Sequence, residues 1–235
     1  MTISGLSLFF PFYNEEKKVE EAIRLAYQVL LTLDLEEYEV FAVDDGSKDE
    51  TGAILDQLKS KDYPDLAVIH HFPNRGYGGA LKSGFLNSHF EWVCFTDGDL
   101  QFDLNEIANF LERAQKGDCD LVVGRYLFRS VPLFRRVNTL FWGILVKLLF
   151  SIKVKDIDCG FKLIKKEVIE KVSPLESNGA FLSTELLVKA QKAGFRIVEV
   201  PVHHYPDLAG GSTGANPKVV IKAFVDLFRL WRKLR

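Results

Sequence analysis

Two aspartates separated by a glycine stand where a strand is expected to end. Asp97 and Asp99 belong to the segment TDGDLQ, which directly follows the apolar run WVCF. Side chains alternate along an extended segment, so both carboxylates, and Gln101 after them, are expected on one side. Two like charges that close repel each other, and a shared proton, open water or a cation would each relieve the repulsion.

Each of these three solutions corresponds to a different use. A shared proton would suit acid–base catalysis, open water would leave an ordinary loop, and a divalent metal would suit phosphate chemistry. Carboxylate and amide oxygens are hard ligands of the kind that Mg²⁺ and Mn²⁺ prefer, and phosphate oxygens and water complete the shell of these ions. We therefore favour a metal held by Asp97, Asp99 and Gln101.

Three further polar segments follow apolar runs in the same way. PFYNEE follows LSLFF, DDGSKDET follows YEVFAV, and NRGYGGA follows LAVIH. In a parallel sheet such segments meet at the carboxyl edge of the strands, where α/β proteins bind their ligands. All three are expected to converge with TDGDLQ on one rim.

These segments also have plain structural interpretations. Asp44 and Asp45 can cap the next helix, with Gly46 providing a positive φ. A carboxylate there can also accept from a nucleobase N–H or a ribose hydroxyl. The glycines of NRGYGGA do not follow the first strand, as a Rossmann fingerprint would, and a glycine-rich start of a helix explains them nearly as well as a phosphate site with Arg75 and Lys82.

Alternating apolar runs and helical patterns predict an α/β fold with a mixed, mainly parallel sheet flanked by helices. Strands are expected at 6–10, 38–43, 66–70, 91–96, 120–124 and 195–200. Helices are expected at 15–33, 50–60, 79–90, 103–116, 137–150 and 181–193. Beyond residue 150 the alternation loosens around CGFKLIKKE. No linker or repeat divides the chain, so we expect one catalytic domain at 1–216 and a basic amphipathic helix at 217–235.

The composition excludes several classes of protein. A chain of 235 residues that is 47% hydrophobic can bury a sizeable core and does not suit a disordered protein. Three separated cysteines support neither a disulfide framework nor a zinc site and suit a reduced compartment. The first residues lack the pattern of a signal peptide, and no apolar run reaches the ~18 to 20 residues that cross a bilayer. We expect no nucleic-acid partner.

Together the motifs resemble those of glycosyltransferase family 2, and most of all those of the polyprenyl-phosphate (dolichol-phosphate) sugar synthases. PFYNEE, VDDGSKDET, NRGYGGAL, TDGDLQ, GRY and DCGFK occur in the order and spacing of that family over residues 5–216. The resemblance implies a Rossmann-like GT-A fold, a nucleotide-sugar donor, Mg²⁺ or Mn²⁺ on the DxD motif, and inversion at the anomeric carbon.

The resemblance also implies roles for single residues. Donor binding is expected from Pro11, Tyr13, Asn14, Glu15, Val43, Asp44, Asp45, Lys82, Asp97, Gly98, Asp99 and Gln101. The acceptor or a phosphate is expected to meet Arg125, Arg135, Arg136, Lys162 and His204. The catalytic set is expected to comprise Asp97, Asp99, Arg125, Asp158 and Glu185. Asp207 departs from the family, which commonly has an arginine in this loop, so the phosphate contact there is in question.

Two apolar helices with basic residues bear on the acceptor. Residues 137–150 would form a helix about 21 Å long, too short to cross a bilayer but able to lie in its interface. The tail mixes apolar residues with cations in the same way, although both helices can instead pack in the core or between subunits. A lipid phosphate is already largely dianionic near pH 7 and needs no general base, whereas a hydroxyl acceptor would need Asp158 or Glu185.

The expected function is therefore an inverting, metal-dependent hexosyltransferase that uses GDP-mannose or UDP-glucose and transfers the sugar to polyprenyl phosphate. It is expected in the cytoplasm, peripherally on the cytoplasmic membrane face, with a membrane protein as a further candidate partner. A glycan or protein hydroxyl acceptor and a non-catalytic nucleotide-sugar-binding protein stay open as alternatives. A nucleotidyltransferase is disfavoured, because a Gly-rich, lysine-bearing loop after the first strand is absent.

Overall fold

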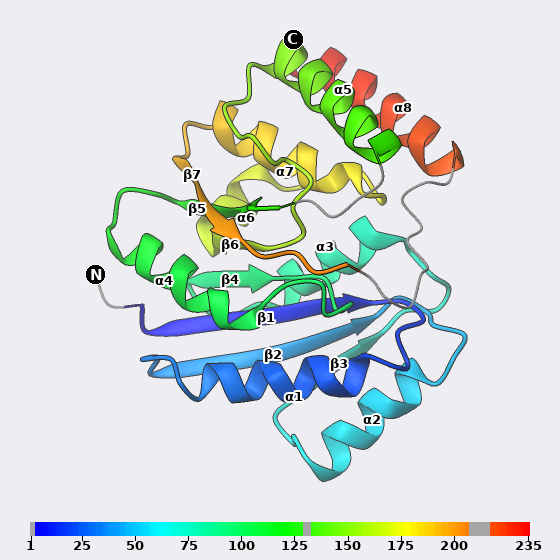
Figure 1. Cartoon of the computed structure of the whole chain (residues 1–235), viewed down its shortest axis with the longest axis vertical. Coiled ribbons are helices and arrows are strands. Elements are labelled where there is room, and N and C mark those ends of the chain that lie inside the picture. Colours follow the sequence, from blue (N-terminus) through cyan, green and yellow to red (C-terminus); the bar gives the residue numbers. More distant parts are fainter. Residues whose placement is uncertain (1–2, 129–132, 207–216) are drawn as a thin grey trace.

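A seven-stranded sheet runs through the middle of the molecule (Figure 1). The computed structural model describes residues 3–128, 133–206 and 217–235. The strands are β1 (Gly5–Phe12), β2 (Glu37–Asp44), β3 (Ala67–His70), β4 (Trp92–Phe95), β5 (Leu121–Tyr126), β6 (Lys162–Lys165) and β7 (Ile197–Val202). Their order across the sheet is β3-β2-β1-β4-β6-β5-β7.

Most neighbouring strands are parallel, as expected. β3, β2, β1 and β4 run in one direction, and β7 is parallel to β5. β6 is antiparallel to both of its neighbours, β4 and β5. This strand comes from KLIK within CGFKLIKKE, the segment where the alternation of the sequence loosens.

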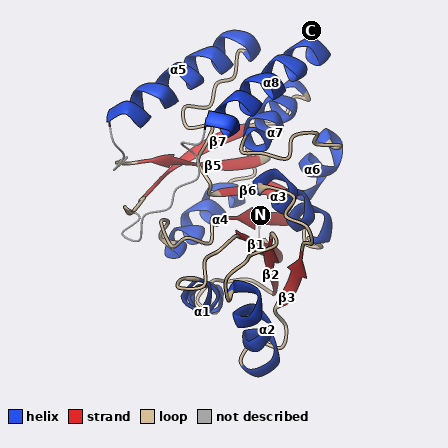
Figure 2. Ribbon diagram, turned by 90° about the vertical axis from the view of Figure 1, so that its right-hand side faces the viewer, coloured by secondary structure: helices blue, strands red, loops and turns tan. Residues whose placement is uncertain are grey.

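Helices cover both faces of the sheet (Figure 2). They are α1 (Val19–Leu30), α2 (Thr51–Lys61), α3 (Tyr77–Asn87), α4 (Ile107–Gln115), α5 (Leu133–Phe150), α6 (Lys166–Val172), α7 (Phe181–Lys192) and α8 (Pro217–Leu234), with a 3₁₀ turn at Leu104–Glu106 before α4. One core cluster joins the sheet to α1, α2 and α4, and a second joins it to α3 and α5 to α8.

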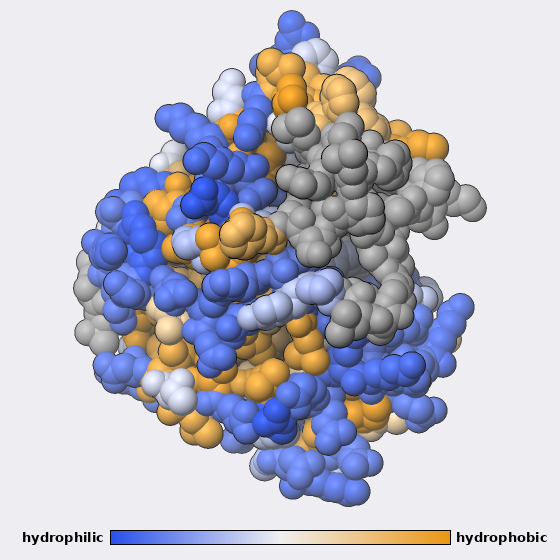
Figure 3. All heavy atoms as spheres, in the orientation of Figure 1, coloured by the Kyte–Doolittle hydropathy of each residue, from blue (hydrophilic) through white to orange (hydrophobic). Residues whose placement is uncertain are grey.

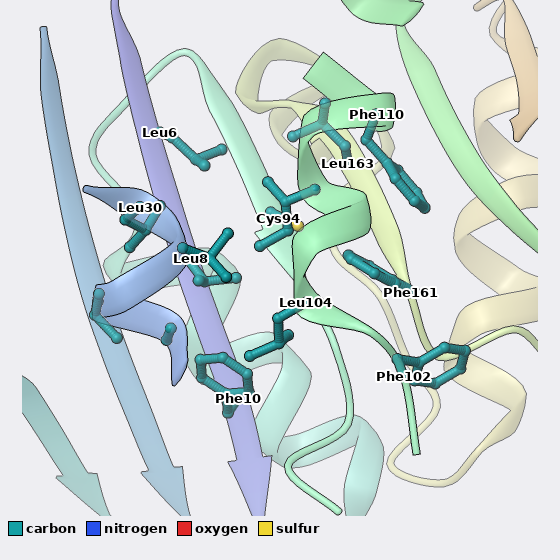
Figure 4. Close-up of a cluster of buried hydrophobic side chains, with 14 of the residues drawn as sticks. Leu6, Leu8, Phe10, Leu30, Cys94, Phe102, Leu104, Phe110, Phe161 and Leu163 are labelled. Atoms are coloured by element: carbon teal, nitrogen blue, oxygen red, sulfur yellow. The ribbon is translucent and has the colours of Figure 1, made fainter. Parts of the chain in front are cut away.

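β1 is apolar along its length because both of its faces are covered. Leu8 and Phe10 lie in the cluster with α1 and α4, as Figure 4 shows, and Phe9 lies in the cluster on the other face. Burying one such side chain is worth about 1.5–3 kcal/mol. The chain therefore places its first strand in the centre of the molecule, where its carboxyl end is fixed in position.

The strand register decides the shape of the carboxyl edge. Phe12 of β1 is level with Asp44 of β2, and Asp44 is level with His70 of β3. β4 stops at Phe95, which is level with Phe9, while β1 continues to Phe12. Measured along the strand direction, the segment after β4 therefore begins before the level at which β1, β2 and β3 end.

α5 and α8 lie side by side beyond α7 (Figure 1). The ring of Trp142 on α5 packs edge-on against Phe181 of α7 and Phe224 of α8, at centroid distances of 6.0 and 5.4 Å. Leu227 and Leu230 of α8 are buried in the same cluster. Within the described residues, no helix combines the length and the apolar character needed to cross a membrane.

Candidate active site

The turns after β1 and β2 are joined by hydrogen bonds from backbone N–H groups to side-chain oxygens. Asn14 adopts a positive φ of 56°, a conformation that asparagine tolerates better than most residues. Its backbone N donates to Ser47 Oγ at 3.0 Å, and its side-chain Oδ1 accepts from Lys48 N at 2.8 Å. These bonds fix the expected donor-binding residues Tyr13 and Asn14 at the carboxyl edge.

The adjacent carboxylates after β2 have different surroundings. Asp44 Oδ1 accepts from Ser47 N at 2.9 Å, and Asp44 Oδ2 lies 3.0 Å from His70 Nδ1. Both oxygens serve the protein itself, so Asp44 stabilises the turn and is not placed to bind a donor as expected. Val43 beside it is fully buried, main chain included, so it is not placed to contact a donor as expected. Asp45 turns to the loop after β3, where its Oδ1 accepts from Arg75 N at 2.9 Å.

The segment after β4 is a turn, and the expectation of an extended segment is wrong. Leu100 has a φ of 59°, and Asp99 Oδ1 accepts from Gln101 N at 3.1 Å. The amide Nε2 of Gln101 donates to the carbonyl oxygen of Tyr205 at 2.9 Å. Gln101 thus holds the segment after β7 and does not line up with Asp97 and Asp99 by strand alternation.

Asp97 and Asp99 still lie close enough for their charges to interact. Burial, and then the charge of Asp99, raise the pKa of Asp97 to about 7, against the lowering effects of Tyr77 and Lys162. The charge of Glu15, at the end of β1, raises it further. A cation at this place would relieve the repulsion between carboxylates.

The donor set fits an ion that takes few protein ligands. In the part of the chain that the structure describes, no three or more His, Cys, Asp or Glu side chains are grouped to hold a metal. Asp97 and Asp99 therefore offer a site of two carboxylates, with oxygen ligands only. Mg²⁺ and Mn²⁺ suit such a site when substrate phosphates and water complete the shell.

Three residues, Tyr77, Gly160 and Phe12, surround the DxD segment, and none of them was among the expected site residues. Tyr77 Oη donates to Asp97 Oδ1 at 2.7 Å. Gly160 faces Asp97 so closely that an added Cβ would lie 2.2 Å from Oδ2. A Cβ on Gly98 would lie 2.2 Å from the ring of Phe12. Tyr77 and Gly160 stand in NRGYGGA and DCGFK, so their place in these motifs was the available signal.

Lys162 is not placed to bind a phosphate, contrary to expectation. Its side chain is on β6 with 0% of its surface exposed. The ammonium donates to Ser183 Oγ at 2.6 Å and to the carbonyl oxygen of Cys159. Burial lowers its pKa, against the nearby charges of Cys159, Asp158 and Asp97. Lys162 therefore supports, from inside, the loop that carries Gly160.

Glu185 is also misassigned as a catalytic base. The residue is 2% exposed on α7, and its carboxylate accepts from the backbone N of Glu176 and of Ser177, both at 2.9 Å. It also pairs with Lys189 at 2.7 Å. All of these contacts are structural. Asp158, by contrast, is exposed and lies next to the loop residue Gly160 that faces Asp97.

Lys82 points to a different side of α3 from Tyr77, the residue of this helix that donates to Asp97. Successive residues of a helix are 100° apart, so Lys82 and Tyr77 point in nearly opposite directions. Lys82 Nζ donates to Asn178 Oδ1. It lines an open hollow of about 490 Å³ together with Asn74, Arg75, Gly79, Ser83, Leu86 and Asn178.

The remaining expected residues lie toward β5 and β7. Arg125 is half-exposed near the end of β5. His204 packs edge-on against Phe102 and Tyr126, at centroid distances of 5.2 and 4.9 Å. The side chains of Arg135 and Arg136, and Asp207 as a whole, lie outside the described residues.

A comparison with known protein families matches the part of the chain that contains the DxD segment and the strands around it. A family model described as Glycosyl transferase family 2 matches residues 7–173. The chain belongs to glycosyltransferase family 2. This agrees with the resemblance inferred from the motifs.

Two curated relatives illustrate the match. The chain is 34% identical over 208 residues to Glycosyltransferase AglD of Haloferax volcanii, an alignment that covers 86% of this chain and 33% of that protein. It is 30% identical over 214 residues to Dolichyl-phosphate beta-glucosyltransferase of Dictyostelium discoideum, covering 84% of this chain and 65% of the relative. The chain thus spans a third of the first relative's length and just under two thirds of the second's.

The fold agrees with that of solved glycosyltransferases. Mannosyltransferase PcManGT from Pyrobaculum calidifontis, in complex with GDP-Man and Mn²⁺, superposes with a TM-score of 0.68 at 19% sequence identity. The superposition covers 97% of this chain and 65% of the mannosyltransferase. The expected GT-A type of α/β fold is confirmed.

Proposed function

We propose that this family 2 glycosyltransferase moves a hexose from a nucleotide diphosphate sugar, of the GDP-mannose or UDP-glucose type, to the phosphate of a polyprenyl lipid. The observation that carries the proposal is the pair of Asp97 and Asp99 in the turn after β4, at the carboxyl edge of the sheet, with Asp97 held by Tyr77. The similarity to a dolichyl-phosphate beta-glucosyltransferase and to a mannosyltransferase in complex with GDP-Man supports the two substrates.

Asp97 and Asp99 would hold the Mg²⁺ or Mn²⁺ ion of this reaction. When bound there, the ion supplies positive charge that stabilises the departing diphosphate. Tyr77 keeps one oxygen of Asp97 fixed by its hydrogen bond of 2.7 Å. Gly160 leaves the space that the other oxygen occupies. The chain's own contribution is therefore a carboxylate that is oriented before the donor arrives.

The nucleoside of the donor would lie over the ends of β1 and β2. Tyr13 is 39% exposed at this edge and presents a ring on which a base can stack. Asp45 provides a carboxylate that can accept from a base N–H or a ribose hydroxyl. Asn14 holds the two turns together, so these groups keep a fixed spacing.

A phosphate acceptor can react without a general base at the sugar. A phosphate oxygen of the lipid attacks the anomeric carbon, a new C–O bond forms on one side, and the bond to the donor diphosphate breaks on the other. The electron pair of that bond leaves with the diphosphate, and the anomeric configuration inverts. No proton has to be removed from the acceptor near pH 7, which agrees with the structural use of the Glu185 carboxylate.

The outer faces of α5 and α8 suit a membrane surface. Exposed apolar side chains gather there and we call them the outer apolar face, which comprises Phe141, Ile144, Leu148, Ile221, Val225 and Phe228. Figure 3 shows apolar side chains at the end of the molecule where these helices lie. Lys222, Arg229 and Arg232 on α8 are exposed beside them. Apolar side chains next to cations are typical of helices that lie in the interface of anionic membranes, so we propose that the protein binds peripherally to an anionic membrane surface.

The test is a transfer assay with both candidate donors. Radiolabelled GDP-mannose or UDP-glucose is incubated with polyprenyl phosphate in vesicles and Mg²⁺ or Mn²⁺, and the organic phase is counted. We expect label in the organic phase with one donor, and its loss in Asp99→Asn. Absence of product with both donors and both ions would overturn the proposed acceptor.

A hydroxyl acceptor is the second candidate, because Asp158 is exposed beside the loop that faces Asp97. With a glycan or protein acceptor, Asp158→Asn would abolish turnover while donor binding survived. With a lipid phosphate acceptor, the same variant would keep substantial turnover. The two acceptors are therefore separated by a single substitution.

A further inference from the structure

A buried histidine lies behind the expected nucleoside site. His71, the residue after β3, is 3% exposed. Its Nδ1 lies 2.6 Å from Asp45 Oδ1, and its Nε2 lies 2.8 Å from Ser83 Oγ on α3. The imidazole therefore joins the turn after β2 to the helix after β3.

The strand register explains this contact. Asp44 and His70 are level in neighbouring parallel strands, so the residues that follow them, Asp45 and His71, leave the sheet side by side. The two histidines then diverge. His70 pairs with Asp44 and Asp56, whereas His71 turns to Asp45 and is enclosed.

The hydrogen-bond partners fix where the proton of the imidazole lies. Asp45 Oδ1 also accepts from Arg75 N at 2.9 Å, so it acts as the acceptor in this network. Nδ1 of His71 then donates to Oδ1. Nε2 is in hydrogen-bond contact with the Ser83 hydroxyl, so a relay joins Ser83, His71 and Asp45.

Only one oxygen of Asp45 is engaged in this way. Oδ1 takes both donors, whereas Oδ2 takes part in no hydrogen bond among residues 3–128, 133–206 and 217–235. The carboxylate cannot rotate without breaking two bonds to Oδ1. Its second oxygen is thus held in one direction as an acceptor.

We propose that His71 is a positioning residue for donor binding, which acts by fixing Asp45 so that Oδ2 accepts a hydrogen bond from the nucleoside of the donor. The inference rests on the proposed function, because it needs a nucleotide at this edge. His71 touches neither substrate nor reacting atoms. It sets the affinity for the donor and not the rate of transfer.

The competing explanation is that His71 only fills space in the core. Two amide variants distinguish this explanation from a positioning role. In His71→Asn the side-chain NH₂ falls near the place of Nδ1 and can still donate to Asp45. In His71→Gln the amide reaches toward Ser83 and leaves Asp45 Oδ1 without this donor. Glutamine is nearer to histidine in size, so a space-filling role predicts that His71→Gln is the milder change. The positioning role predicts the opposite order.

The experiment is a calorimetric titration of the full chain with GDP and with UDP in the presence of Mn²⁺. We expect His71→Gln to raise Kd about tenfold or more, since a hydrogen bond to a charged group is lost, and His71→Asn to stay within about threefold of the wild type. His89→Gln is the matched control, because His89 is exposed and pairs with Glu39 elsewhere in the fold. Its Kd should not change.

Equal Kd values for the two amide variants, or a weaker nucleotide affinity in His71→Asn, would overturn the inference. Thermal unfolding of each variant shows whether it folds. If His71→Gln does not fold, Ser83→Ala decides, because it removes the far end of the relay and should raise Kd about two- to threefold; an unchanged Kd would contradict the relay. A wild type that binds neither nucleotide would instead overturn the proposed function itself.

Transfer kinetics give a second readout. His71→Gln should raise the KM for the donor and leave kcat near that of the wild type, because the lost contact is made equally in the ground state and in the transition state. A fall in kcat with unchanged KM would assign His71 to another role and overturn the inference.

Discussion

Residues from three segments of the chain set the position and charge of Asp97. Tyr77 at the start of α3 donates to it, Gly160 before β6 leaves room for it, and Asp99 in its own turn repels it. None of these contacts involves a substrate. The carboxylate is therefore oriented by the protein, as a site that binds a metal together with a diphosphate needs.

Gly160→Ala is expected to displace Asp97. The new Cβ would lie 2.2 Å from Oδ2, so the carboxylate must move although the backbone is otherwise tolerant. Metal-dependent nucleotide affinity, measured by calorimetry, should fall about tenfold or more. Gly143→Ala is the matched control, since nothing lies within 4 Å of its added Cβ. An unchanged affinity in Gly160→Ala would show that Asp97 does not depend on this space.

His70 should make stability depend on pH. Burial opposes its charged form, but hydrogen bonds with Asp44 and Asp56 outweigh this and raise its pKa. The charged form thus stabilises the fold below the unfolded pKa of about 6.5, and this contribution is lost as pH rises through the higher folded value. Urea unfolding should show wild type exceeding His70→Gln most at acid pH. A gap that widens toward alkaline pH would refute this assignment.

Candidate site residues could be predicted from the sequence where they directly follow the end of an expected strand. Asp45, Asp97 and Asp99 were predicted in this way, and the same rule applied to the residues after the third strand would have found His71. Lys162 and Glu185 were expected at the site because of their place in the motifs that resemble the family's. That place does not show that a side chain is buried, because buried partners such as Ser183 come from distant parts of the chain.

At the scale of elements, the turn after β4 shows what strand alternation misses. A carboxylate pair spaced by one residue lies on one side by strand alternation only if the backbone stays extended, and the turn that begins at Gly98 and Asp99 ends that geometry. The two charges interact nevertheless, since Asp99 raises the pKa of Asp97. The expected proximity of the pair therefore did not depend on the extended conformation from which it was inferred.

Glu185→Gln should affect the fold and not the reaction. The carboxylate holds the loop before α7 through two backbone N–H groups and pairs with Lys189. Replacing a buried, hydrogen-bonded charge by an amide should lower the free energy of unfolding by about 1–3 kcal/mol. Chemical unfolding measures this change, and transfer at a permissive temperature should stay within about threefold of the wild type. Loss of turnover in a stably folded variant would restore Glu185 as a base.

Long periodic elements were predictable and short ones were not. The helical face of Val19, Ile23 and Leu30 gives α1 directly, although the expected range of 15–33 was too long at both ends. β6 has four residues and α6 has seven, too few for a period to stand out. β6 is also placed by its pairing with β4 and β5, which is a tertiary effect.

For the whole molecule, the sheet separates two surfaces with different expected uses. The carboxyl edge carries Asp97 and, more deeply buried at 3% exposure, Asp45, and the outer apolar face lies on α5 and α8 beyond α7. The overall α/β plan followed from the alternation of elements along the chain. Which parts of the two outer helices are buried did not, because an apolar stripe alone does not distinguish a core face from an exposed one.

The outer apolar face should bind anionic vesicles. Phe141 and Leu148 are 68% and 77% exposed on α5, and Phe228 is 50% exposed on α8. Phe228→Asp should reduce flotation with vesicles that contain anionic lipid by several-fold, because an apolar contact is replaced by a charge that the surface repels. Leu31→Asp is the matched control, since Leu31 is also exposed but lies after α1. Equal flotation of Phe228→Asp and the wild type would exclude this face as the membrane contact.

The most direct test of the central claim is the binding of Mn²⁺ itself, followed by the electron paramagnetic resonance signal of the free ion. In the presence of GDP or UDP, the wild type should bind about one Mn²⁺ per chain, because carboxylates and diphosphate share the ion. Asp99→Asn should remove this binding while the fold, checked by thermal unfolding, persists. Nucleotide-dependent Mn²⁺ binding that is undiminished in Asp99→Asn would contradict a metal site at the Asp97–Asp99 pair.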